Sequence, residues 1–155
     1  MSTSTPTFEE YLDAVYRAYQ DLLSATLHPA ADHSTMPASG GVYVFYENGQ
    51  SIYVGRTRNM RRRLRQHSHP NSTHYSASFA FLMARKEAAL PALPKLTREQ
   101  VAKELDSPFR HCRERVGLMS VRWVAVEDPI VQSLLEVYAS VTLRTTEHYN
   151  SFQTT

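Results

Sequence analysis

The segment GVYVFYENGQSIYVGRTRNMRRRLRQH, residues 41–67, constrains the fold of this chain more than any other. It contains two short apolar runs, at residues 41–46 and 50–55, on either side of Asn48-Gly49. Asn-Gly between apolar runs is the strongest short-range signal for a β-hairpin. An arginine-rich segment with helical spacing follows. The sequence therefore predicts a hairpin that leads directly into a short basic helix, at about residues 59–67.

Apolar residues recur at helical spacing through most of the remaining chain, whereas SVRWVAVE alternates as a strand does. Three residues are predicted to cap the first turn of a helix: Thr7, with Glu10 as its capping-box partner, Thr97 and Asp128. The segments HPAADHSTMPASGG and PALPKL indicate a linker and a helix break. We therefore expect an α+β fold, with a small three-stranded antiparallel sheet flanked by helices.

The hairpin register determines whether Tyr43 and Tyr53 share a face of the sheet. With Asn48-Gly49 as a two-residue loop, Val44 faces Tyr53 and the two tyrosines lie on opposite faces. With Glu47-Asn48-Gly49 as a three-residue loop closed by a bulge, Tyr43 lies directly opposite Tyr53. We favour the second register because it separates two sets of side chains: Val42, Val44, Tyr46, Ile52 and Val54 from Tyr43, Phe45, Ser51 and Tyr53. Paired tyrosines are also ordinary stabilisers of a sheet, so the strand pattern alone favours a structural role for them.

Helical phase separates one arginine of the basic segment from the others. Met60 and Leu64 are four residues apart and are expected to face the core. Arg63 and His67, also four apart, lie beside this apolar stripe and are expected to point toward the tyrosines. The other arginines of the segment are expected to face solvent or a polyanion: Arg58, Arg61, Arg62 and Arg65.

The overall composition excludes several classes of protein. The 155 residues are 42% hydrophobic and 21% charged, which is typical of one soluble globular domain. No apolar run approaches the roughly 20 residues that cross a bilayer, and the N-terminus resembles no secretory signal. The single cysteine, Cys112, excludes an internal disulfide and argues against a thiolate zinc site. These features predict a cytoplasmic protein, and with a net charge of only +2 the basic segment is a local anion-binding patch.

The motif residues resemble those of the GIY-YIG nuclease superfamily. Gly41-Val42-Tyr43 corresponds to the first motif and Tyr53-Val54-Gly55 to the second. Arg63 follows the second tyrosine at the spacing of the family's arginine, and His67 lies one turn further on, where several members have His or Tyr. The family's metal-binding glutamate on a later helix is matched by Glu136, in the sequence SLLEVY.

The resemblance extends to two further positions. Arg56 follows the second motif, where many members have a basic residue. Asn150 corresponds to the family's asparagine near a Tyr-Asn pair, although the segment from Glu136 to Asn150 is somewhat longer than in the repair-type members. We expect one domain, residues 1–155. The resemblance covers its core, residues 41–67 and 119–150. It does not cover the N-terminal helical extension, residues 1–30, or the helical insertion, residues 75–117.

The resemblance implies a metal-dependent endonuclease that hydrolyses phosphodiester bonds in DNA. Its catalytic residues would be Tyr43, Tyr53, Arg63, His67 and Glu136. As the single carboxylate, Glu136 would hold one divalent cation, Mg²⁺, for which Mn²⁺ could substitute. Arg63 would stabilise the phosphoryl charge, and Tyr43 would activate water with the help of His67 once its pKa is tuned below that of a free phenol. Contacts to the substrate would come from Arg56, Arg58, Arg61, Arg62, Arg65 and Asn150.

The chain is compact and adds helices to the family core. Within this family we therefore favour a sequence-specific restriction enzyme. Alternatives in the same class are repair, mobile-element, single-strand-specific and toxin nucleases. A different class is a non-catalytic nucleic-acid-binding module, but such a module needs the basic patch and not the glutamate. One domain carries one active site, so cutting both strands would require a homodimer on DNA or two successive nicks.

Overall fold

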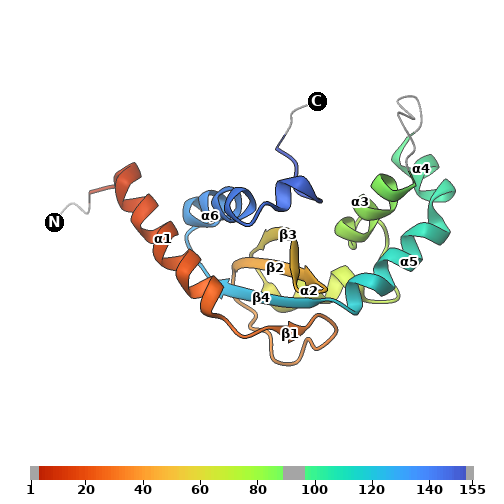
Figure 1. The fold of residues 1–155 in the computed structure, drawn as a ribbon, viewed down its shortest axis with the longest axis horizontal. Helices are drawn as coiled ribbons and strands as arrows, with labels where there is room; N and C mark the ends of the chain where they lie inside the picture. Colours follow the sequence, from red (N-terminus) through yellow and green to blue (C-terminus); the bar gives the residue numbers. More distant parts are fainter. Residues whose placement is uncertain (1–3, 89–96, 153–155) are drawn as a thin grey trace.

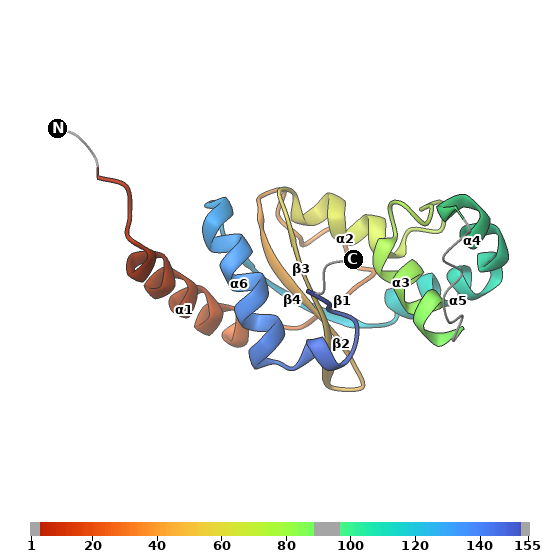
Figure 2. The same ribbon diagram turned by 90° about the horizontal axis from the view of Figure 1, so that it is seen from above.

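The computed structural model describes residues 4–88 and 97–152 and arranges them as a sheet between two groups of helices (Figures 1 and 2). The elements are, in order, α1 (Phe8–Ser24), β1 (His28–Pro29), β2 (Gly41–Glu47), β3 (Gln50–Thr57), α2 (Met60–Ser68), α3 (Ser78–Glu87), α4 (Arg98–Glu104), α5 (Asp106–Gly117), β4 (Ser120–Ala125), α6 (Pro129–Thr142) and the 3₁₀ turn η1 (Thr145–Glu147). The α+β prediction is confirmed. The break expected at residues 91–96 lies outside the described residues. Within the described ranges, none of the helices is both long and apolar enough to cross a bilayer.

The sheet has four antiparallel strands in the order β1-β4-β2-β3. The prediction of three strands is therefore wrong by one. The additional strand is β1, which pairs His28 with Val121 and Pro29 with Ser120. Two residues are too few to show an alternating pattern, which is why this segment resembles a linker in the sequence. Strand β3 forms one edge of the sheet.

The β2–β3 hairpin closes with a two-residue turn. Glu47 pairs with Gln50, and Asn48 and Gly49 both have positive φ angles, 52° and 78°. Positive φ at both central residues is what a type I′ turn requires, and Asn-Gly is the dipeptide that adopts it most readily. The three-residue loop favoured above is therefore wrong.

A bulge then shifts the register next to Phe45. Beyond it Phe45 pairs with Tyr53 and Tyr43 pairs with Gly55, so the expected pairing of Tyr43 with Tyr53 is also wrong. The two tyrosines nevertheless share a face, because side chains two residues apart on a strand point the same way. The unpaired residue is Ile52, which lies in the aromatic core instead of on the aliphatic face predicted for it.

The two faces of the sheet form two separate cores. One is aliphatic and joins the sheet to α1 and α6, through Val15, Leu22, Val42, Val44, Val54, Leu135 and Ala139. The other is rich in aromatic residues and joins the sheet to α2 and the helical insertion, through Tyr43, Phe45, Met60, Leu64, Phe79, Phe81 and Phe109. Full burial of one such side chain stabilises a fold by about 1.5–3 kcal/mol, so each core suffices to fix its helices on the sheet.

The predicted helix starts are confirmed. The Thr7 hydroxyl accepts a hydrogen bond from the Glu10 backbone, and the Glu10 carboxylate accepts one from Thr7. Thr97 and Gln100 form the same reciprocal box at the start of α4. The Asp128 carboxylate caps α6, with Pro129 as the first helical residue. These caps satisfy backbone donors that a first turn leaves free.

Candidate active site

Tyr43 and His67 form a buried hydrogen-bonded pair in the aromatic core. The Tyr43 Oη and His67 Nε2 atoms are 2.7 Å apart, and the two residues are only 1% and 0% exposed. The phenol comes from β2 and the imidazole from the last turn of α2. Met60 and Leu64 are also buried, so the predicted phase of α2 is confirmed.

The phenol of Tyr43 lies over Gly55 in the edge strand β3. A Cβ atom at position 55 would be 2.3 Å from the Tyr43 Oη atom, closer than any side chain can approach. The glycine of the Tyr-Val-Gly motif is therefore required by the packing of Tyr43. The bulge in β3 is what brings this glycine opposite the tyrosine.

Arg63 stands beside this pair and is held by the helical insertion. Its Nη1 donates to the Ser76 carbonyl oxygen at 2.9 Å, and its Nη2 donates to Ser78 Oγ at 2.7 Å. Its positive charge acts to lower the pKa of both Tyr43 and His67. The guanidinium is thus fixed next to the two side chains before any substrate binds, which is the arrangement that electrostatic catalysis requires.

The sequence gives no signal for these contacts of Arg63. Ser76 and Ser78 lie 13 and 15 residues further along the chain, just before α3 and at its first residue, and no periodicity connects them to α2. In the structure the helical insertion supplies the two anchors of Arg63.

Burial raises the pKa of Tyr43 far above that of a free phenol, and it raises the pKa of Tyr53 as well. The charge of Arg63 opposes both shifts but does not overcome burial. Burial and then the Arg63 charge hold the pKa of His67 well below its usual range. Both phenols are therefore protonated and the imidazole is neutral at pH 7. The lowered pKa that a Tyr43 base requires is not present in the isolated protein, where the shift has the opposite sign.

His67 has one ring nitrogen without a partner. Among the described residues, no group forms a hydrogen bond with its buried Nδ1 atom. A neutral imidazole has one donor and one acceptor nitrogen, so Nε2 can accept the hydrogen of Tyr43 only when Nδ1 carries the ring proton. Without a carboxylate or carbonyl at Nδ1, nothing there stabilises an imidazolium. Among the described residues, no hydrogen bond at Nδ1 would therefore stabilise a second proton on His67.

Glu136 faces the same centre from α6. Its negative charge acts to raise the pKa of both Tyr43 and Tyr53. Burial raises the pKa of Glu136 itself, and the opposing charge comes from Arg56, whose Nε atom is 4.0 Å from Glu136 Oε1. That distance is the limit of an ion pair. The carboxylate is therefore partly desolvated without a close partner.

The residues present fit one hydrated divalent cation. Within the described part of the chain, no three His, Cys, Asp or Glu side chains gather into a metal cage. Magnesium keeps several water ligands and binds through one or two carboxylates together with phosphate oxygens, so it needs no such cage. A cation beside Glu136 would also offset the desolvation that raises the pKa of this carboxyl group.

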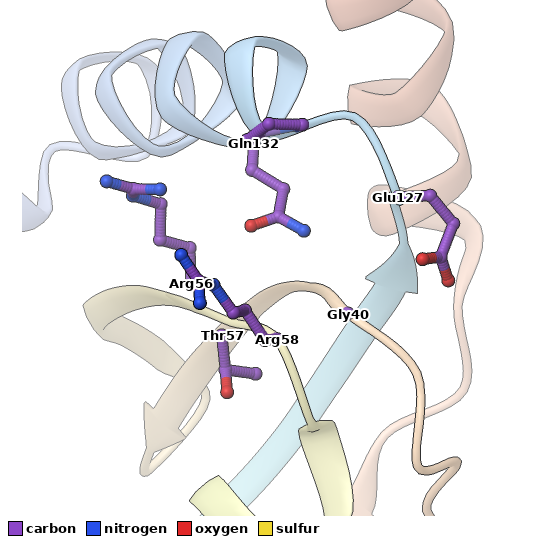
Figure 3. A pocket seen from close by; sticks show the side chains of 7 residues that line it. Gly40, Arg56, Thr57, Arg58, Glu127 and Gln132 are labelled. Atoms are coloured by element: carbon purple, nitrogen blue, oxygen red, sulfur yellow. The ribbon is translucent and has the colours of Figure 1, made fainter.

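A cavity of about 780 Å³ lies next to Arg56 (Figure 3). Figure 3 shows Arg56 and Arg58 on the side opposite Gln132 of α6. The cavity is lined by Gly40, Arg56, Thr57, Arg58, Glu127, Pro129 and Gln132. Gln132 precedes Glu136 by one helical turn, so both side chains face the same region. Sequence analysis did not identify Gln132, although its four-residue spacing from Glu136 could have indicated it. The Gln132 amide is fixed by a 2.5 Å hydrogen bond from its Nε2 to the Val126 carbonyl oxygen.

Arg63 differs in exposure from the other arginines of the basic segment, as the helical phase predicted. Arg63 is partly buried, whereas four others are exposed: Arg58, Arg61, Arg62 and Arg65. Arg56, on β3, is exposed as well. Arg61 also donates from its Nε atom to the Met36 carbonyl oxygen at 2.8 Å.

Two further predicted residues lie along β3. The Tyr53 ring stacks on Phe79 with a centroid separation of 4.2 Å, and its centroid lies 6.3 Å from that of His67. Asn150 accepts from the Val54 backbone nitrogen at 2.8 Å and donates to the Val54 carbonyl oxygen at 2.9 Å. Both ends of the amide thus bind the edge strand, where they hold the C-terminal segment against β3. A substrate contact of Asn150 stays a prediction.

Comparisons with known proteins agree with the motifs. Residues 39–103 match the family model described as the GIY-YIG catalytic domain. The match includes both tyrosine motifs, Arg63 and His67, continues into the helical insertion and ends before Glu136. The resemblance inferred from the motifs is confirmed.

No curated protein matches the chain. Among solved structures, similarity is found to the GIY-YIG N-terminal endonuclease domain of UvrC from Thermotoga maritima, a point mutant bound to its catalytic divalent cation. The two chains are 18% identical, and the alignment covers 77% of this chain and 90% of that one with a TM-score of 0.41. A TM-score of this size supports no assignment for the present chain.

Proposed function

Because residues 39–103 match the GIY-YIG catalytic domain, which is a nuclease domain, we propose that this chain is a metal-dependent endonuclease that hydrolyses phosphodiester bonds in DNA. The observation that carries the proposal is the buried Tyr43–His67 hydrogen bond with the Arg63 guanidinium held beside it. Tyr53, and Glu136 from α6, would complete the catalytic set.

Arg63 would bind the scissile phosphate and stabilise the charge that develops on its oxygens. Its guanidinium is already oriented by Ser76 and Ser78, so little reorganisation accompanies the reaction. Preorganised donors of this kind typically contribute about 10²–10³ in rate. Arg56 and Arg58, exposed beside the 780 Å³ cavity, would hold the backbone that flanks this phosphate.

Tyr43 and His67 would act as a proton relay. The attacking water gives a proton to Tyr43 Oη, while Tyr43 gives its own proton to His67 Nε2 across their 2.7 Å contact. Neither group has to be charged beforehand, which agrees with the direction of both pKa shifts. The incoming phosphate supplies the negative charge that the imidazolium lacks, so the relay becomes favourable only with substrate bound. Tyr53 would position the water and the phosphate.

Glu136 would hold the divalent cation, which we take to be Mg²⁺ with Mn²⁺ as a substitute. When bound there, the cation would supply charge neutralisation at the phosphate and the leaving oxygen. Arg56, at 4.0 Å from the carboxylate, is free to turn toward the DNA backbone when the cation takes its place.

Within this class we favour a sequence-specific, restriction-type enzyme, because helices α3 to α5 and α1 extend the sheet and α2 with surfaces that can read DNA. Each chain has one such centre, so a double-strand break would take a homodimer on DNA or two successive nicks. The order in which nicked and linear plasmid appear at several protein concentrations separates these routes.

The direct test is incubation of the full chain with single-stranded, duplex and branched DNA in magnesium, followed by sequencing of the product ends. A restriction-type enzyme gives ends at one sequence in duplex DNA. Scattered ends, or cleavage confined to single-stranded or branched DNA, would replace the restriction assignment with another nuclease type. Binding without cleavage of any substrate would contradict the proposal and leave a nucleic-acid-binding module.

A further inference from the structure

Gln132 is a buried polar side chain that belongs to none of the motifs described above. It lies in the first half of α6 and is only 5% exposed. Its amide nevertheless lines the 780 Å³ cavity, together with Arg56 and Arg58 (Figure 3). Burial of a polar side chain is costly unless its donors and acceptors find partners. Among the described residues, only the nitrogen end of this amide has one, the carbonyl oxygen of Val126.

The protein fixes the orientation of the Gln132 amide. Its Nε2 atom donates to the Val126 carbonyl oxygen at 2.5 Å, and a carbonyl oxygen only accepts, so the nitrogen has to face Val126. Gly40 leaves the space for this nitrogen, because a Cβ atom at position 40 would lie 2.8 Å from it. The Oε1 atom consequently points the other way, and Figure 3 shows it on the side of Arg56. In the described part of the chain, no hydrogen bond reaches Oε1.

A fixed amide oxygen selects the groups that can bind beside it. It accepts hydrogen bonds and donates none, so a phosphate oxygen is disfavoured there and a donor is required. Glu136 lies one turn further along α6, and Cβ atoms at this spacing are about 5–6 Å apart. Water bound to a divalent cation at that carboxylate is a charge-assisted donor within reach of the amide oxygen. The other carboxylate in the cavity wall, Glu127, lies on the far side of Gln132 from Arg56 in Figure 3.

We propose that Gln132 is a positioning residue for the divalent cation, and that its Oε1 atom accepts a hydrogen bond from a water ligand of the cation that Glu136 holds. The inference rests on the proposed function, which assigns the cation to Glu136. Because Mg²⁺ keeps several of its waters when it binds to protein, an acceptor for one of them restricts how the hydrated ion is oriented. Residues that hold the ligands of a metal in this way typically change its affinity by about 10–100-fold.

The test measures Mn²⁺ binding to the full chain without DNA, from the loss of the EPR signal of the free ion. Gln132→Met keeps the length of the side chain and removes the acceptor. Glu136→Gln identifies the site, because it removes the carboxylate that would hold the ion. Glu127→Gln is the matched control, since it removes an exposed carboxylate from the same cavity wall. The melting temperature of each variant without metal reports separately on the loss of the Val126 hydrogen bond.

We expect Gln132→Met to raise the dissociation constant for Mn²⁺ by about tenfold or more, whereas Glu127→Gln should match the wild type. In plasmid nicking, the magnesium concentration that gives half of the maximal rate should rise by a similar factor in Gln132→Met. The rate at saturating magnesium should fall less than that factor. An unchanged Mn²⁺ affinity would overturn the proposal even if the melting temperature fell, because Gln132 would then only tie α6 to Val126.

The variants also separate failure of this inference from failure of the proposed function. If Glu136→Gln abolishes Mn²⁺ binding and Gln132→Met preserves it, the metal assignment stands and Gln132 has no part in it. If Glu136→Gln leaves the Mn²⁺ affinity unchanged, the cation does not lie at Glu136, and both the metal assignment and this inference are wrong. A loss of affinity in Glu127→Gln as large as that in Gln132→Met would overturn the inference as well, since the ion would then lie at Glu127.

Discussion

Helices α2 and α5 are both rich in arginine, yet Arg115 of α5 and the exposed arginines of α2 differ in whether their charge is compensated. On α5, Arg115 donates from Nε and Nη2 to the two carboxylate oxygens of Glu47, each at 2.6 Å, and from Nη1 to Glu87. On α2, Arg62 and Arg65 are exposed and, among the described residues, lack an ion-pair partner. An arginine with carboxylate partners links elements of the fold, whereas an exposed arginine without such a partner can bind an external anion. The difference gives Arg115 a structural role and supports the proposed contacts of Arg62 and Arg65 with nucleic acid.

Arg63 belongs to α2 but resembles Arg115 in being held by the protein. Its partners, however, are the Ser76 carbonyl and the Ser78 hydroxyl, which orient the guanidinium without cancelling its charge. An oriented and still uncompensated charge beside the Tyr43–His67 pair is suited to a transition state that gains negative charge.

The largest effect on the cleavage rate is expected from the loss of the Glu136 carboxylate. Glu136→Ala should reduce magnesium-dependent cleavage below detection while DNA binding, measured without metal, remains. The reason is that Glu136 is the carboxylate proposed to hold the cation, and it is partly desolvated. Glu114→Ala, an exposed position on α5, is the control. Cleavage by Glu136→Ala that persists in magnesium would remove the metal assignment.

The next largest effect distinguishes two arginines of the same helix. Arg63→Ala should lower the single-turnover cleavage rate by about 10²–10³, because it removes a preorganised donor to the phosphate. Arg61→Ala, on the opposite side of α2, should lower it by less than about tenfold, the effect of one backbone contact. Equal losses in the two variants would show that helical phase does not select the catalytic arginine.

A smaller effect is expected from an anchor of Arg63. Ser78→Ala removes the 2.7 Å hydrogen bond to Nη2 and should lower the cleavage rate by about tenfold, which corresponds to one hydrogen bond to a charged group. Ser78→Thr keeps the hydroxyl and should restore the rate. In an Arg63→Ala background the same change should have no further effect. If the losses in cleavage rate were additive in the double variant, Ser78 would act independently of Arg63.

The smallest effect on activity should come from the neutralised arginine. Arg115→Ala should leave the cleavage rate of the folded enzyme nearly unchanged but reduce the free energy of unfolding by about 1–2 kcal/mol, because three charge-assisted hydrogen bonds are lost. The melting temperature should fall by about 2–8 °C. Arg110→Ala is the control, since its ion pair with Asp106 is exposed and contributes little.

The stability difference between Arg115→Ala and the wild type should also depend on pH. Hydrogen bonds from Arg115 hold the pKa of Glu47 below its ordinary value of 4.5. A lowered carboxyl pKa contributes stability that is complete above the ordinary pKa and disappears as the pH falls through the folded-state pKa. The difference in melting temperature should therefore be constant from pH 7 to about pH 5 and shrink in more acidic solution. A difference that grows on acidification would contradict this account of the Glu47 pair.

The sequence alone predicted the structure correctly where helical periodicity or a capping residue determines it. The positions of Met60 and Leu64 specified the phase of α2 and so selected Arg63 and His67. Likewise, Asp128 with Pro129 specified the start of α6, which carries Glu136. In these cases the information lies within one or two turns of a helix.

The sequence failed where distant packing decides the outcome. The bulge at Ile52 forms because the Tyr43 ring needs Gly55 opposite it, and alternation along a single strand contains no sign of that contact. Strand β1 exists through its pairing with β4, and Ser78 reaches Arg63 from another helix. The pKa shift of Tyr43 was missed for the same reason, since burial depends on the whole core.

The most direct test of the central claim is nicking of supercoiled plasmid by the full chain, with magnesium and after chelation by EDTA. An enzyme built around Tyr43, Arg63 and Glu136 should convert the plasmid to nicked circles in magnesium and stop when the metal is removed. Plasmid that is bound but stays supercoiled in both magnesium and manganese would contradict the account.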